Sequence, residues 1–143
     1  MMIFRCKWEQ LPNKLISSGN AGRWNLAGDR VIYCSESRAL AAFEVLVHMK
    51  SDWMVSTFNF IGIQIPEKEP LKIDPFENFK IREEECQNLG HEWYESQTSL
   101  LLKVPSVIIP KEWNYLINTQ HSDFDGVKIK MIEPFYQFDQ RLY

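Results

Sequence analysis

Arg23, Tyr33 and Glu44 have the residue types and surroundings that suit chemistry on a phosphorylated, ring-bearing molecule. Arg23 follows Gly22 inside a glycine-rich loop over 19–28, where another group can approach the backbone closely. A guanidinium in such a place suits bidentate phosphate binding. A tyrosine ring can stack on a planar heterocycle while its hydroxyl makes a polar contact. The three residues together predict a pocket for an anionic, ring-bearing ligand.

Arg23 and Tyr33 each have a structural interpretation as well. Arg23 can be a surface residue stacked on Trp24. Tyr33, which shares one face of a short strand with Val31 and Ser35, can be a core tyrosine at a strand end. Spacing alone leaves both alternatives open.

Glu44 lies in the middle of an apolar helix, with Leu40, Ala41 and Val47 three and four positions away. An unpaired buried carboxylate costs several kcal/mol, so this one must be paired, be protonated or face a cleft. A salt bridge to Arg23 is the structural alternative. A carboxylate facing a cleft is the functional one, because perturbed carboxylates cluster at functional sites.

Ser106 follows Pro105, which interrupts a strand, so its hydroxyl belongs either to a turn or to a cleft. No histidine is near enough in sequence to indicate a Ser–His pair, and a nucleophilic serine is therefore not favoured. The three histidines have no metal-ligand spacing with one another or with cysteine, so no metal site is expected: His48, His91 and His121.

The elements around these residues predict an α+β chain with a mixed, largely antiparallel sheet and few helices. Gly90 is expected to end a helix, and Ser35 or Ser37 to cap the helix that carries Glu44. Strands are expected at 2–8, 31–35, 53–65, 72–74, 99–104, 107–109 and, as a closing strand or hairpin, 127–132 and 135–138. Helical segments are expected at 11–16, 38–49, 81–88 and 93–97.

Composition excludes several classes of function. A chain of 143 residues predicts one domain over 1–143, and a net charge of −3 without basic runs argues against direct nucleic-acid binding. Three widely spaced cysteines without a C-x-x-C pair indicate free thiols in a reducing compartment. No targeting segment or membrane-length apolar run is present, which predicts a cytoplasmic protein without membrane contact.

Ordered blocks over nearly the whole chain resemble the RES domain family, which is named for its Arg, Glu and Ser. The blocks are GRWN at 22–25, Gly28, VIYCS at 31–35, ALA at 39–41, EVLVH at 44–48, Gly90, Trp93, LLKVPS at 101–106, NYLIN at 114–118, His121 and FDQRL at 138–142. One departure is Ala21, where a second glycine is expected.

The resemblance implies a split sheet similar to that of ADP-ribosyltransferase toxins of the diphtheria type. It implies a toxin of a bacterial type II toxin–antitoxin module that depletes NAD by cleaving the nicotinamide–ribose bond, by hydrolysis or phosphorolysis. NAD would be the substrate, inorganic phosphate a co-substrate of the phosphorolytic route, and no cofactor is expected. The implied partner is an Xre-like helix-turn-helix antitoxin, in an oligomer with the toxin. A protein ADP-ribosyltransferase and a catalytically idle antitoxin-binding module are the alternatives.

The family's catalytic residues fall on Arg23, Tyr33, Glu44 and Ser106, and its substrate-binding residues on Arg23, Tyr33, Ser106 and Asn118. Nicotinamide leaves a pyridinium as a neutral molecule, so the acid carboxyl of ordinary glycosidases is unnecessary and one carboxylate suffices. Glu44 would stabilise the oxocarbenium ion, Arg23 hold the pyrophosphate and Tyr33 stack on nicotinamide. Ser106 would fix either the substrate or Arg23.

Overall fold

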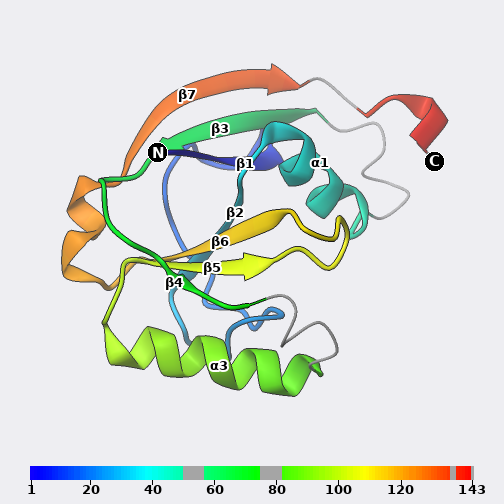
Figure 1. Ribbon diagram of the computed structural model, residues 1–143. Helices are drawn as coiled ribbons and strands as arrows, with labels where there is room; N and C mark the ends of the chain where they lie inside the picture. The colour runs from blue at the N-terminus through cyan, green and yellow to red at the C-terminus, as the bar shows by residue number, and fades with distance from the viewer. Residues whose placement is uncertain (50–56, 75–81, 136–137, 143) are drawn as a thin grey trace.

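A seven-stranded sheet forms the framework of the computed structural model, which describes residues 1–49, 57–74, 82–135 and 138–142 (Figure 1). The strand order is β4-β5-β6-β2-β1-β3-β7, and every neighbouring pair is antiparallel except β4 and β5. The strands are β1 (Met2–Trp8), β2 (Val31–Ser35), β3 (Phe58–Gln64), β4 (Leu71–Lys72), β5 (Leu101–Pro105), β6 (Trp113–Asn118) and β7 (Lys128–Phe135). The helices are α1 (Arg38–Leu46) and α3 (Glu83–Ser96), with 3₁₀ turns η2 (Ser122–Gly126) and η3 (Gln140–Leu142). The predicted α+β class with a mixed, largely antiparallel sheet is confirmed.

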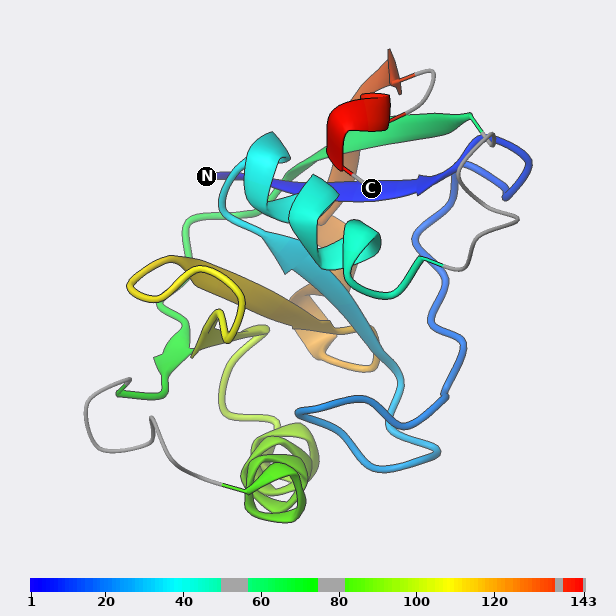
Figure 2. The ribbon, with the colours of Figure 1, turned by 90° about the vertical axis from the view of Figure 1, so that its right-hand side faces the viewer.

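The sheet splits between β1 and β2. Only Phe4 and Ser35 are paired at this junction, whereas β1 pairs with β3, and β2 with β6, along their whole lengths. Helix α1 packs on the β1–β3 half, and α3 packs on the half made by β2, β5 and β6. Figure 2 shows the two helices on opposite sides of β2. The split therefore leaves room for a cleft over β2.

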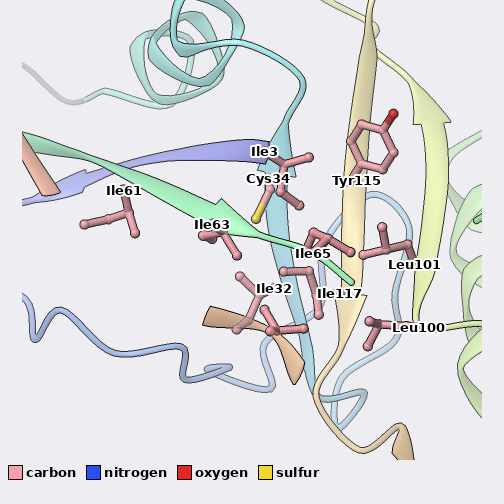
Figure 3. Packing of buried hydrophobic residues seen from close by; sticks show 11 residues of the cluster. Ile3, Ile32, Cys34, Ile61, Ile63, Ile65, Leu100, Leu101, Tyr115 and Ile117 are labelled. Atoms are coloured by element: carbon pink, nitrogen blue, oxygen red, sulfur yellow. The ribbon is translucent and has the colours of Figure 1, made fainter. Parts of the chain in front are cut away.

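The largest hydrophobic cluster lies on the other face of the sheet (Figure 3). In β2, Ile32 and Cys34 belong to this cluster, while Val31 and Tyr33 belong to the cluster beneath α3. Successive side chains of a strand point to opposite faces, so burial of Ile32 and Cys34 turns Tyr33 towards the helices. The face assigned to Tyr33 from the sequence is correct.

Helix α3 differs from the prediction of two helices separated at Gly90. It is continuous from Glu83 to Ser96, and Gly90 lies inside it. A Cβ atom on Gly90 would lie 1.5 Å from the carbonyl oxygen of Trp24. The glycine therefore permits close approach of a loop. The helix ends at Ser96, and its C-cap residue Gln97 has a left-handed φ of 57°.

Two other predicted elements are not formed, and in both segments side chains hydrogen-bond to backbone groups. Residues 11–16 are not helical, and the Leu11 carbonyl accepts a hydrogen bond from the Lys7 ammonium. Residues 107–109 form a turn rather than a strand, because the amides of Ile108 and Ile109 donate to the hydroxyl of Ser106. Strand β6 was not predicted from the sequence.

The remaining boundaries moved by a few residues. Helix α1 ends at Leu46 instead of Met49, and its cap is Ser37, whose hydroxyl accepts from the amide of Leu40. Strand β7 is continuous over Lys128–Phe135, so the single strand is the observed form of the predicted closing strand or hairpin. Within the described residues, the boundaries of β3, β4 and β5 differ from the predicted ones by one or two positions. Parts of the predicted strands over 53–65 and 135–138, and of the predicted helix over 81–88, lie outside the described residues. Within the described part of the chain, no helix is both long and apolar enough to cross a bilayer.

Candidate active site

A cavity of about 760 Å³ lies at the split in the sheet and is lined by residues of both α1 and α3. Arg23, Tyr33 and Glu44 all line it, although they come from a loop, a strand and a helix. Small-molecule sites in proteins usually measure about 300–1,000 Å³, so the cavity can hold a ligand of nucleotide size. The structure thus brings the three residues singled out in the sequence to one cavity.

The loop over 19–28, called the arginine loop below, is closed by its own backbone. The amide of Gly28 donates to the carbonyl of Gly19 at 2.8 Å, and the amide of Gly22 donates to the carbonyl of Asn25 at 3.2 Å. Gly19 and Gly28 have φ values of 73° and 96°, which side chains with a Cβ adopt with strain. The sequence prediction of a glycine-dependent loop is correct at these two positions.

Tyr33 anchors this loop through its hydroxyl. The hydroxyl donates to Oδ1 of Asn25 at 2.5 Å and accepts from the amide of Trp24 at 3.0 Å. Burial raises the pKa of Tyr33 to about 12, and the hydrogen bond from Trp24 only partly opposes this. A Cβ on Gly22 would lie 2.6 Å from the same hydroxyl, so the glycine lets Tyr33 reach the loop. Since the hydroxyl is engaged there, the ring is the part of Tyr33 that remains for a ligand.

Arg23 is exposed and its guanidinium hydrogen-bonds the thiol of Cys86 on α3. Burial raises the pKa of this thiol, and the guanidinium opposes the rise. Trp24 is buried in the cluster beneath α3, and among the described residues no cation–π contact joins it to Arg23, so the surface arginine stacked on Trp24 is not observed. The guanidinium lines the cavity as a permanent positive charge.

Helix α3 holds the base of the arginine loop. Nε2 of Gln87 donates to the carbonyl of Gly22 at 2.9 Å. Nδ1 of His91 lies 2.9 Å from Oδ1 of the buried Asp29, and Oδ2 of Asp29 accepts from the amide of Leu26. These contacts fix the backbone on both sides of Arg23.

Glu44 is half-buried and its carboxylate is bound by neutral side chains. Nδ2 of Asn114 donates to Oε1 at 2.6 Å, and Oγ of Ser106 donates to the same oxygen at 3.2 Å. Among the described residues, the ion pair between Glu44 and Arg23 that the sequence allowed is absent. Glu44 is therefore a carboxylate at the cavity and not the ion-pair partner of Arg23.

Ser106 is buried and supports Glu44 from behind. Its hydroxyl donates to Glu44 and accepts from the amides of Ile108 and Ile109, both at 3.1 Å. All of these contacts join Glu44 to the turn after β5. Ser106 lies beside Glu44, rather than beside Arg23.

Asn118 does not reach the cavity. It is completely buried at the end of β6, where Nδ2 donates to the carbonyl of Tyr94 and Oδ1 accepts from the amide of Gln120. It lies four positions along the strand from Asn114, or roughly 13 Å away. Its contacts join α3 to the turn after β6, so its position indicates a structural role.

Sequence reasoning missed Asn114 and Ser35. Oγ of Ser35 donates to Oδ1 of Asn114 at 2.6 Å, and the two residues are paired across β2 and β6. Polar residues at two inward-facing strand positions were the available signal. The signal could not be used because β6 itself was not predicted.

The described residues include one group with the atoms of a metal site: Asp29, His91 and Glu95. The contact between Asp29 and His91 already belongs to the anchoring of the arginine loop, and Glu95 is exposed at 4.0 Å from the ring. The three cysteines are buried and stand outside any disulfide, in agreement with the prediction of thiols in place of a disulfide framework.

The family model of the RES domain matches residues 3–139. This chain belongs to the RES domain family. The chain is 34% identical over 127 residues to Toxin Res of Yersinia enterocolitica, covering 85% of this chain and 83% of that protein. It is 32% identical over 129 residues to the Prs ADP-ribosylating toxin of Sphingobium sp. (strain YBL2), covering 85% of this chain and 80% of that protein.

The fold of this RES domain is also that of a solved structure, the MbcT–MbcA toxin–antitoxin complex of M. tuberculosis. The TM-score is 0.73, and the match covers 94% of this chain and 83% of that one. At 14% identity the likeness shows the fold alone.

Proposed function

We propose that this RES domain protein is a toxin that depletes NAD by cleaving its nicotinamide–ribose bond, with water or phosphate as acceptor. The observation that carries the proposal is the arrangement of Glu44, which is bound by Asn114 and Ser106 in a cavity that Arg23 also lines. Relatives named as toxins support the toxic role.

The proposed mechanism needs one carboxylate. Nicotinamide departs from a pyridinium as a neutral molecule, so no acid must protonate it, and the barrier lies in forming the oxocarbenium ion. The carboxylate of Glu44 stabilises that cation by its negative charge and accepts a hydrogen bond from the ribose. Arg23 binds the pyrophosphate, and the ring of Tyr33 contacts the nicotinamide. The acceptor then attacks the anomeric carbon.

A turnover assay tests this proposal. The purified protein is incubated with NAD, with and without phosphate, and the products are identified by mass. We expect Glu44→Gln to lower kcat/KM at least about 100-fold, because it removes the charge that stabilises the cation. Glu92→Gln makes the same change on the exposed side of α3 and serves as the control. Intact NAD with the wild-type protein, together with equal NAD binding by Glu44→Ala and wild type, refutes the enzymatic proposal.

Protein ADP-ribosylation is the second candidate, and the name of the Sphingobium relative favours it. The same cavity would serve, with a protein side chain as acceptor in place of water or phosphate. Labelled ADP-ribose on a protein band would identify this activity. Free ADP-ribose, or ADP-ribose 1″-phosphate in the presence of phosphate, would identify the first.

The proposed partner is an Xre-like helix-turn-helix antitoxin that covers the cavity in the cytoplasm. Support comes from the shared fold with a toxin of a toxin–antitoxin complex and from the cavity rim. Val47 and Val107 line the cavity, and their exposed fractions of 54% and 58% leave apolar surface for a partner. Growth arrest on induction, relieved by the neighbouring gene product, would support this role. Growth arrest that persists in Glu44→Ala would instead favour an idle binding module.

A further inference from the structure

A chain of hydrogen bonds runs from the split in the sheet to the carboxylate of Glu44. The hydroxyl of Ser35 donates to Oδ1 of Asn114, and Nδ2 of Asn114 donates to Oε1 of Glu44, both at 2.6 Å. Ser35 is buried at the end of β2, directly opposite Asn114 on β6. These hydrogen bonds therefore connect β2 and β6 with helix α1.

The donor and acceptor roles in this series of hydrogen bonds follow from the chemistry of Glu44 and Ser35. An ionised carboxylate only accepts hydrogen bonds, so the amide must turn its NH₂ group towards Glu44. The other side of the amide is then a carbonyl oxygen, which needs a donor, and Ser35 provides one. Hydrogen bonds to a charged acceptor are also the stronger kind.

The two oxygens of Glu44 are not equivalent as a result. Oε1 accepts from both Asn114 and Ser106. Within the described residues, no hydrogen bond reaches Oε2. One oxygen is thus used to orient the carboxylate, and the other remains for a ligand in the cavity.

We propose that Asn114 is a positioning residue for Glu44, and that Ser35 acts through it by keeping the amide turned. Asn114 holds Oε1 so that Oε2 meets the ribose of the substrate. This inference deepens the proposed NAD cleavage and rests on it. The competing explanation is a structural one, in which Asn114 only ties β6 to α1.

The isosteric variant Asn114→Asp tests the contact with Glu44, and Asn114→Ala separates the two explanations. It places a second carboxylate 2.6 Å from Glu44, and two carboxylates at that distance share a proton. Because this coupling follows from the contact, the acid limb of the kcat profile should move up by about 2 pH units. For Asn114→Ala, a structural tie alone predicts lower stability with kcat unchanged, whereas a positioning role predicts a lower kcat.

The measurement is NAD cleavage from about pH 5 to 9 for wild type, Asn114→Asp, Asn114→Ala and Ser35→Ala, with thermal unfolding of each. Asn114→Ala is expected to lower kcat about 10–100-fold while KM changes much less, as for other side chains that orient a catalytic group. Ser35→Ala should change kcat in the same direction by a smaller factor. Asn88→Asp, on the exposed face of α3, is the matched control and should leave the profile unchanged. None of these variants changes the other titratable side chains that line the cavity, which are Arg5, Cys6, Arg23, Tyr33, Cys34, His48 and Glu83.

A second readout keeps the result independent of turnover. A ¹³C NMR titration of the Glu44 carboxyl should show a higher midpoint in Asn114→Asp than in wild type. Equal midpoints, or an Asn114→Ala variant with wild-type kcat, overturn the positioning role even if NAD is cleaved. Wild-type protein that leaves NAD intact while the midpoint moves overturns the proposed function and retains the coupling of Asn114 to Glu44.

Discussion

Replacing Gly90 by alanine should destabilise this protein although Gly90 lies inside a helix. In an open helix, alanine is more favourable than glycine by about 1 kcal/mol. Here the new Cβ would lie 1.5 Å from the carbonyl oxygen of Trp24 and 2.6 Å from its carbonyl carbon. Restoring an ordinary contact requires the helix and the arginine loop to separate by about 2 Å in a closely packed interior.

The expected cost exceeds the gain in helix propensity. Overpacking of this kind costs about 1–3 kcal/mol and sometimes more, and the buried Trp24 also loses its packing beneath α3. We expect a net loss of about 2 kcal/mol in the free energy of unfolding, which lowers Tm by roughly 6 °C in a chain of this size. Arg23 precedes Trp24, so the same displacement should raise KM for NAD several-fold.

Urea and thermal unfolding of Gly90→Ala and wild type provide the test. The control is Asn88→Ala, at an exposed position of the same helix, which should change stability by less than about 0.5 kcal/mol. A Gly90→Ala protein as stable as wild type, or more stable, would refute the close approach of α3 and the arginine loop.

Three further predictions concern the neighbours of the cavity. Gln87→Ala removes the hydrogen bond to the Gly22 carbonyl, which should cost about 1 kcal/mol in urea unfolding and raise KM for NAD more than it lowers kcat. Ser106→Ala should lower kcat less than Glu44→Gln does, because the serine supports the carboxylate and is not a nucleophile; equal losses in a turnover assay would contradict this. The pKa of Tyr33 is raised to about 12, so above pH 10 the unfolded chain loses this proton while the folded chain keeps it, and stability falls as the pH rises. Urea unfolding at about pH 9 and 10.5 should therefore show a smaller loss for Tyr33→Phe than for wild type.

The family and the fold class could be predicted from the sequence because their signals are ordered along the chain. The blocks around Arg23, Tyr33 and Glu44 indicated the RES domain family, and the family model confirms it. Strands β1 and β2 and the start of α1 were predicted within a residue, since alternation and a serine cap are local properties.

The partner of Glu44 was decided only by the tertiary structure. The sequence left a choice between a salt bridge to Arg23 and a carboxylate at a cleft. Asn114 settles it from a strand 70 positions away, through a pairing with β2 that joins Ser35 and Asn114 across 79 positions. Periodicity within a few residues carries no information about contacts between residues so far apart in the sequence.

The roles of Gly90 and Asn118 also depend on contacts between segments that are distant in sequence. A glycine near the end of a helical pattern ordinarily marks the helix end, yet here it admits the Trp24 carbonyl from a loop that is distant in sequence. Asn118 belongs to the same block as Asn114, but four residues of extended strand place it at the far end of β6. The local sequence specifies which residue types surround the arginine, the tyrosine and the glutamate. The tertiary structure decided which of those residues meet, because strand pairing and helix–loop packing bring together groups whose separation along the chain carries no local signal.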